Sequence, residues 1–237
     1  MTLNVYRSDT EAFGTSGALV LAYLRAANAK GYRNLTQGHL SKLLGISDRT
    51  IRAKIQQTGA QLTRHSRYMT IDHVPAPTTT WFFTVTLEDI KQLGFKKAMV
   101  KGLLTSSCRY HGLVRFSNAL LTKALGMARE TFSPLVAQLQ EEGVVLASRF
   151  YDFNTSMNHF WLPEAPPSDE AIYAAYQEEA QHWKTFYSFS SYKDSARAQE
   201  QRQDFKKDRR VDDRAGLSIE TVCSTFKANT KVLQGVC

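Results

Sequence analysis

Cysteine is scarce in this sequence, and the three that occur have no pairing pattern. Cys108, Cys223 and Cys237 are an odd, scattered set without a CxxC spacing. This usage argues against a disulfide framework and favours reduced thiols in a cytosolic compartment. Cys108 is interpreted as a buried thiol rather than a nucleophile.

Long apolar runs are also missing. No stretch approaches the roughly 18 residues that a membrane-spanning helix needs. The N-terminal segment MTLNVYRSDTEAFG lacks the apolar core of a signal peptide. We therefore expect a soluble, cytoplasmic protein without a membrane partner.

Recognisable catalytic and metal-binding motifs are absent as well. The sequence has no HExxH, no Cys/His metal spacing, no phosphate-cradling GxxxxGK[ST] and no GxSxG. Its histidines are scattered, at positions 39, 65, 73, 111, 159 and 182. We expect neither an enzyme nor a bound cofactor or metal.

Positive charge is present in excess and is unevenly distributed. The 237 residues carry a net charge of +8. Residues 1–73 hold ten Lys and Arg against four Asp and Glu, residues 74–163 are at +3, and residues 164–237 are at −1. A basic N-terminal segment favours an acidic partner such as nucleic acid.

The basic segment contains a helix-turn-helix pattern, TQGHLSKLLGISDRTIRAKIQQTG, at residues 36–59. Gly45 supplies the positive φ of a tight turn, and Ser47 is the predicted N-cap of the second helix. Ile51 and Ile55, one helical turn apart, form that helix's buried stripe. Two short helices joined by a glycine-containing turn are typical of DNA-binding proteins.

The flanking sequence extends this pattern. A largely buried helix is predicted from Ser16 to about Lys30, and residues 1–14 are predicted to be irregular or a short strand. Strand-like segments follow Gly59, with Pro75 and Pro77 in the loop between them. They predict a two-stranded hairpin, here called the first wing, which either carries Arg64, His65 and Arg67 or has the VPAPTTT loop (74–80) as its tip.

The helix-turn-helix pattern recurs 81 residues later. After a helical stretch at about 87–105, LTKALGMARETFSPLV (121–136) aligns with LSKLLGISDRTIRAKI (40–55). Core and turn positions coincide, including Leu44 with Leu125 and Gly45 with Gly126. A second wing is predicted from VVLASRFYDF, the loop NTSMN and HFWL. An internal repeat of one structural unit is the main organisational signal in the chain.

The chain beyond Pro167 is predicted to be an accessory region. Ser168 caps a helix with Ile172, Tyr176, Trp183 and Tyr187 on one face, which packs on its own domain or binds a partner. The polar remainder from Ser188 is predicted to be weakly structured, except for a short helix at Ser218–Phe226.

The helix at 48–58 carries the predicted base-reading face. Opposite its buried stripe lie Arg49, Arg52 and Gln56, suited to guanine and adenine in the major groove. Thr50 and Lys54 flank this face and suit phosphate contacts. The second copy has fewer basic residues, with Arg129 beside Glu130 and with Pro134 expected to kink its helix. That copy is either a second DNA contact or a dimerisation or packing module.

The predicted DNA-contacting set covers both copies. It consists of Thr36, Gln37, Ser47, Arg49, Thr50, Arg52, Lys54, Gln56, Arg64, Arg67, Lys123, Arg129, Thr131 and Ser133.

With both copies in view, the chain resembles the winged-helix domains of bacterial transcription regulators and of plasmid and phage replication initiators. The stretches ALVLAYLRAANAKGYRNLTQGHLSKLLGISDRTIRAKI and GLVRFSNALLTKALGMARETFSPLVAQLQEEGVV carry the resemblance. It implies a mainly α fold with small β wings (α+β), built from two tandem winged helix-turn-helix domains. The predicted divisions are winged-helix domains at 1–86 and 87–163, a C-terminal amphipathic helix at 164–190, and a polar, partly disordered tail at 191–237.

Three functions follow as hypotheses. The first is a nucleoid-associated regulator of transcription that binds double-stranded DNA at a specific sequence. A mobile element is one candidate for the regulated DNA. The second is a replication initiator that uses both winged helices on repeated origin sites. The third is a protein-interaction scaffold that does not read DNA. A scaffold does not require the net charge of +6 that residues 1–73 carry. A homodimer through the second domain or the C-terminal helix is a further candidate interaction.

Overall fold

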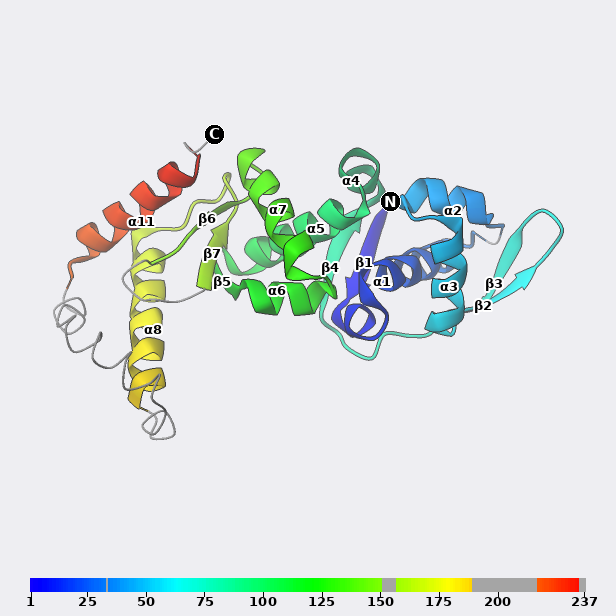
Figure 1. Ribbon diagram of the computed structural model, residues 1–237, viewed down its shortest axis with the longest axis horizontal. Coiled ribbons are helices and arrows are strands. Elements are labelled where there is room, and N and C mark those ends of the chain that lie inside the picture. The colour runs from blue at the N-terminus through cyan, green and yellow to red at the C-terminus, as the bar shows by residue number, and fades with distance from the viewer. Residues whose placement is uncertain (33, 151–156, 189–216, 235–237) are drawn as a thin grey trace. The chain divides into compact units, whose positions relative to one another are not determined.

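The computed structural model describes residues 1–32, 34–150, 157–188 and 217–234, with the side chains of 183–188 and 231–234 left aside (Figure 1). It is mainly α-helical with small antiparallel sheets, which confirms the predicted α+β class. Residues 1–111 with 116–145 form one compact unit, and residues 112–115 with 146–237 form a second. Each unit is described by itself.

The first unit contains both helix-turn-helix pairs. In chain order its elements are β1 (Thr2–Tyr6), α1 (Arg7–Ala29), α2 (Gln37–Leu44), α3 (Asp48–Thr58), β2 (Gln61–Arg64), β3 (Met69–His73), β4 (Phe82–Thr86), α4 (Leu87–Leu93), α5 (Phe95–His111), the end of β5 (Val114–Ser117), α6 (Asn118–Leu125) and α7 (Arg129–Glu141). The sequence predicts a domain boundary at residue 86. The structure differs, because that position lies inside the first unit, between β4 and α4.

The first pair, α2 and α3, follows its local sequence signals. Gly45 adopts the left-handed conformation, with φ 63° and ψ 28°, between the two helices. Thr36 Oγ1 accepts a hydrogen bond from His39 N at 3.1 Å, and Ser47 Oγ accepts one from Thr50 N at 3.3 Å. Both side chains satisfy helix N–H groups that have no partner within the helix. The predicted turn and the predicted Ser47 cap are confirmed.

The second pair, α6 and α7, begins and turns at the predicted offset of 81 residues, although α7 has 13 residues where α3 has 11. Gly126 is left-handed like Gly45, with φ 59°, and Ser117 caps α6 by accepting from Leu120 N. α7 differs because Ala128 gives its first turn no side-chain cap. The sequence predicts a kink at Pro134; in the structure Pro134 lies inside α7, which runs from Arg129 to Glu141.

The strands of the first unit pair differently from the prediction. β2 and β3 form a hairpin closed by a turn at residues 65–68, with Leu35 bridged to Met69 beside it. β4 does not join this hairpin but pairs antiparallel with β1. The loop at 74–80 is therefore a connection between two sheets, and the hairpin that forms carries Arg64, His65 and Arg67 at or beside its turn.

The core of this unit forms around β1 and β4. The side chains of Leu3, Val5, Phe83 and Val85 are almost completely buried. Gly102 allows α5 to approach β4, since a Cβ at that position would lie 2.4 Å from the backbone oxygen of Thr84. The N-terminal residues, predicted to be irregular or a short strand, therefore supply one of the two strands around which the core of the unit forms.

The second unit joins a small sheet to two helices. Its sheet has the order β5-β7-β6, with β6 at Leu146–Ser148 and β7 at Met157–Trp161, and its helices are α8 (Asp169–Ser188) and α11 (Ile219–Gln234). α8 contributes Ile172 and Tyr176 to an aromatic core with Phe150, Trp161 and Phe226. The predicted face of this helix thus packs within its own unit at Ile172 and Tyr176.

The C-terminal region is partly structured. Ser168 caps α8 as predicted, accepting from Ala171 N at 3.2 Å. α11 extends beyond the predicted short helix, and Val222, Cys223 and Phe226 on it are buried. The side chains of Trp183 and Tyr187, and the predicted tail at 189–216 and 235–237, lie outside the described residues. No helix in the described part of the chain is long and apolar enough to cross a membrane.

A buried histidine makes the second unit sensitive to acid. His159 is 1% exposed, and neither ring nitrogen has a hydrogen-bond partner among the described residues. Burial, with Arg115 nearby, lowers its pKa from 6.5 to about 4, although Glu179 acts in the opposite direction. The folded state therefore holds a neutral imidazole at a pH where the unfolded chain binds a proton.

We expect the free energy of unfolding to fall as pH decreases from 6.5 to 4, by up to about 3 kcal/mol from this group. Replacing His159 with Phe, which suits the edge-on contact with Phe150, should remove that part of the pH dependence. Urea unfolding of both proteins between pH 4 and 8, followed by tryptophan fluorescence, measures the difference. Parallel pH profiles would contradict the assignment.

Candidate nucleic-acid interface

The outward face of α3 is polar and basic. Arg49, Arg52 and Gln56 are exposed, whereas Ile51 on the opposite side is fully buried. The spacing of three and four residues places the exposed side chains on one face of the helix. The structure therefore brings together the three residues that the sequence predicts to read bases.

Arg52 is positioned by a residue from the preceding helix. Its Nε donates to Gln37 Oε1 at 2.8 Å, so the guanidinium is connected to the first turn of α2. A guanidinium has five N–H donors, and this bond uses only one. The two terminal nitrogens remain suited to a bidentate contact with an acceptor pair.

Two exposed arginines, Arg64 at the end of β2 and Arg67 in the turn, lie at the tip of the β2–β3 hairpin. Arg64 and Arg67 line a small hollow that also includes Thr36 and Gln37 at the start of α2. Tyr68, which the sequence prediction missed, closes the turn: its backbone oxygen accepts from His65 N at 2.8 Å, and the two rings stack 4.6 Å apart. An aromatic residue within a basic turn is the signal that would have identified it.

This hollow concentrates groups that bind anions. The first N–H groups of a helix and the adjacent helix dipole favour a negative charge, and two arginines add full positive charges beside them. Arg64, Arg67, Thr36 and Gln37 thus lie together, as a phosphate contact next to α3 requires.

Three residues of the predicted DNA-contacting set have partners within the protein. Lys54 is half-buried, and its Nζ donates to the backbone oxygen of Phe13 at 3.0 Å and to Gln57 Oε1 at 2.9 Å. It therefore links α3 to the first part of α1 rather than extending freely toward a ligand. Ser47 and Thr50 share a hydroxyl contact at 2.8 Å in the cap of α3.

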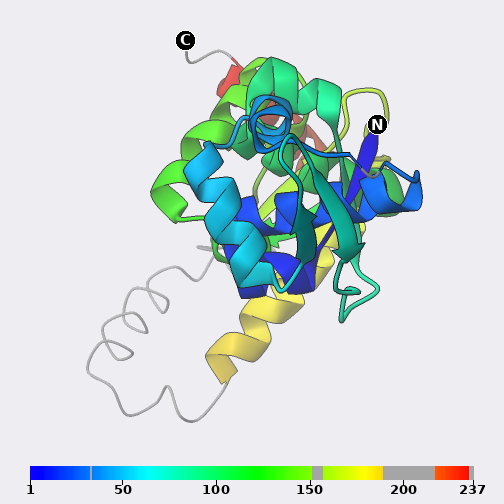
Figure 2. The ribbon, with the colours of Figure 1, turned by 90° about the vertical axis from the view of Figure 1, so that its right-hand side faces the viewer.

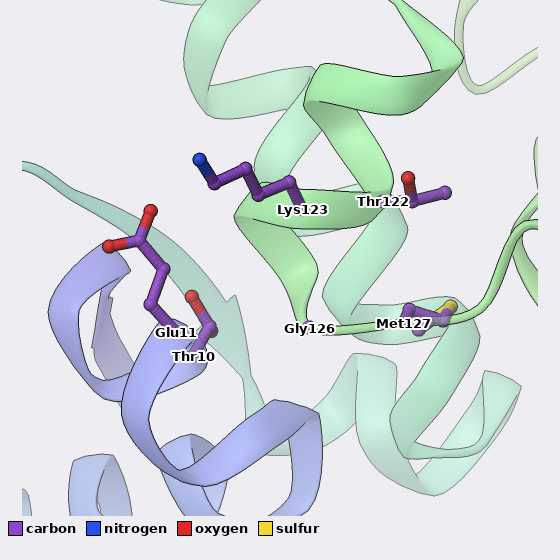
Figure 3. Close-up of a pocket in the computed structure, with 6 residues that line it drawn as sticks. All are labelled: Thr10, Glu11, Thr122, Lys123, Gly126 and Met127. Atoms are coloured by element: carbon purple, nitrogen blue, oxygen red, sulfur yellow. The ribbon is translucent and has the colours of Figure 1, made fainter.

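The corresponding face of α7 is exposed but less basic. Arg129, Glu130 and Ser133 are exposed, and Thr131 is half-buried. Lys123 lines a hollow between α6 and the start of α1, where Figure 3 shows it extending on the same side as Glu11. The Glu11 carboxylate pairs with Arg7 at 2.9 Å, and the exposed face of α7 itself carries Arg129 beside Glu130.

No group of three or more His, Cys, Asp or Glu that could hold a metal ion occurs in the described part of the chain. A scan against protein-family models, a search of curated proteins and a search of solved structures each return no match.

Proposed function

We propose that this chain is a double-stranded DNA-binding protein of winged-helix type, which reads a defined sequence and regulates transcription. The observation that carries the proposal is the arrangement around α3. Arg49, Arg52 and Gln56 share its exposed face, while Arg64 and Arg67 lie at the tip of the β2–β3 hairpin, beside the start of α2.

The order of elements supports the same proposal. The second part of α1, the Leu35 bridge, α2, α3 and the β2–β3 hairpin follow one another in the chain, and Leu35 pairs with Met69 of the hairpin. A winged helix has this order, with the hairpin as its wing. α5, β5, α6, α7, β6 and β7 repeat it, with the sheet order β5-β7-β6.

In the proposed complex α3 occupies the major groove. Arg49 and Arg52 donate to guanine O6 and N7, and Gln56 pairs with adenine N6 and N7. Arg64, Arg67 and the first turn of α2 contact phosphates, which fix the register of α3 without reading sequence. Gln37 holds the Arg52 guanidinium in place before binding, which reduces the conformational entropy lost on binding.

Selection of bound fragments from random duplex DNA tests this proposal directly. We expect one enriched sequence that contains guanines, bound far more tightly than unrelated duplex and weakened steeply by salt. A chain that acts only as a protein scaffold would enrich no sequence. That outcome would reject DNA reading as its function.

The hairpin arginines should contribute affinity without sequence preference. Replacing Arg64 and Arg67 together with Gln should weaken specific and unrelated duplexes in parallel and reduce the slope of log K against log salt by about 2. The matched control is Arg109→Gln, an exposed arginine near the end of α5. Fluorescence anisotropy at several salt concentrations gives the slopes. A loss confined to the selected sequence would contradict the phosphate role.

A further inference from the structure

The internal repeat extends upstream of the two helix-turn-helix pairs. Adding 80 to the residue numbers of β1 (2–6) gives the bounds of β4, and adding 80 to residues 7–13 of α1 gives those of α4. The helical run of α1 is interrupted at Gly14 with φ 69°, and α4 ends at Gly94 with φ 76°. Two copies of one segment, each with a strand, a short helix, a glycine break and a long helix, therefore precede the two pairs.

The pairing of β1 with β4 is symmetric under exchange of the copies. Asn4 pairs with Thr84, its own equivalent in the repeat. On either side, Leu3 pairs with Val85 and Val5 with Phe83, so each pair becomes the other when the copies are exchanged. An antiparallel ladder with this register has a local two-fold axis at its centre.

Helix packing obeys the same exchange. α1 packs on α3 and α5 on α7, each within its own copy. Across the copies, α1 packs on α6 and its counterpart α4 packs on α2. Hydrogen bonds fix one of these contacts, because Thr10 Oγ1 donates to Ala124 O at 2.6 Å and Thr15 Oγ1 donates to Leu125 O at 2.7 Å. The first unit is therefore built like a dimer within one chain.

Exchange of the two copies about the two-fold axis also relates α3 to α7. In Figure 1, α2 and α6, α3 and α7, and α4 and the start of α1 lie at opposite positions around β1 and β4. Figure 2 shows α3 and α7 on the same side of β1. Two helices related by a two-fold axis and presented on one side match the geometry with which dimeric regulators contact a pseudo-palindromic site.

We infer that a single chain recognises two unequal half-sites in inverted orientation, with α3 on the stronger half-site and α7 on the weaker. The inference rests on the proposed function and specifies the target of the same surface. Both helices belong to one compact unit, so the distance between the half-sites should be fixed.

The two half-sites differ because equivalent positions of α3 and α7 carry different chemistry. Arg49 corresponds to Glu130, Arg52 to Ser133, and Gln56 to Ala137 under the 81-residue offset. Where Arg49 donates to guanine, Glu130 accepts from cytosine N4, and Ser133 is compatible with several bases. The weaker half-site therefore carries a different sequence from the stronger one.

The test combines footprinting with measurement of stoichiometry on the selected duplex. We expect one chain per duplex and protection of two half-sites of opposite orientation. Inserting about five base pairs, half a helical turn, between them should lower affinity by about tenfold or more. Glu130→Gln should change base preference in the weaker half-site only, and Arg52→Ala in the stronger only.

Each alternative outcome has a distinct meaning. Protection of a single half-site by one chain, half-sites in the same orientation, or two chains on an inverted pair would overturn the inference while leaving specific DNA binding in place. A duplex selection without any enriched sequence would instead overturn the proposed function itself. Circular dichroism of each variant confirms that a lost footprint does not reflect unfolding.

Discussion

Arg49→Ala and Arg52→Ala should each weaken binding to the selected duplex by about 1–3 kcal/mol and relax base preference at one position of the site. Both side chains lie on the exposed face of α3, so their removal leaves the core unchanged. Each arginine also contributes a positive charge, and binding to unrelated duplex should therefore fall, but by less. Competition binding with selected and unrelated duplexes separates the two effects.

Two further variants make this result specific. Gln37→Ala removes the acceptor that holds Arg52 Nε and should reproduce part of the Arg52→Ala loss, with a smaller effect when Arg52 is already alanine. Arg7→Ala removes an exposed arginine of α1 that pairs with Glu11, and it serves as the control for charge alone. Equal losses on selected and unrelated duplexes for Arg49→Ala and Arg52→Ala would show that these arginines contact only phosphate.

The first helix-turn-helix pair could be predicted from sequence because its determinants are local. Gly45 fixes the turn, Thr36 and Ser47 cap the helices, and Ile51 marks the buried side. Each of these signals acts over a few residues and requires no knowledge of the rest of the chain. The second pair became visible because it repeats the same signals at a constant offset.

The pairing of β1 with β4 could not be predicted in this way. The sequence predicts a strand near Phe82–Thr86, but nothing local identifies its partner, which lies 80 residues earlier. Proximity along the chain favoured a hairpin with the preceding strand. The register depends instead on burying Leu3 and Val5 together with Phe83 and Val85, a property of the assembled core.

The role of Lys54 shows the same limit at the candidate site. A lysine beside a basic helix face is typical of a phosphate contact, and its sequence neighbours give no other indication. Its actual acceptor, the backbone oxygen of Phe13, is available there because the helical run of α1 is interrupted at Gly14. Charge patterns identify a candidate binding face, whereas the partners of single charges depend on tertiary contacts.

The turn between α6 and α7 packs closely against α1. Gly126 lies against α1, and a Cβ there would be 2.7 Å from Thr10 O and 3.0 Å from Gly14 Cα. Both neighbours are backbone atoms, which no rotamer change can move away. Gly45, its counterpart, has nothing within 4 Å of such a Cβ. The two glycines thus share a left-handed φ but differ in their surroundings.

Gly126→Ala should therefore lower the free energy of unfolding by about 3–4 kcal/mol. About 1–2 kcal/mol comes from the left-handed conformation, and the rest from overpacking against α1 and weakening the Thr10 and Thr15 hydrogen bonds. Gly45→Ala should incur the conformational part alone. Urea unfolding followed by circular dichroism compares the two variants. Equal destabilisation would mean that the turn of α6 and α7 does not rest on α1.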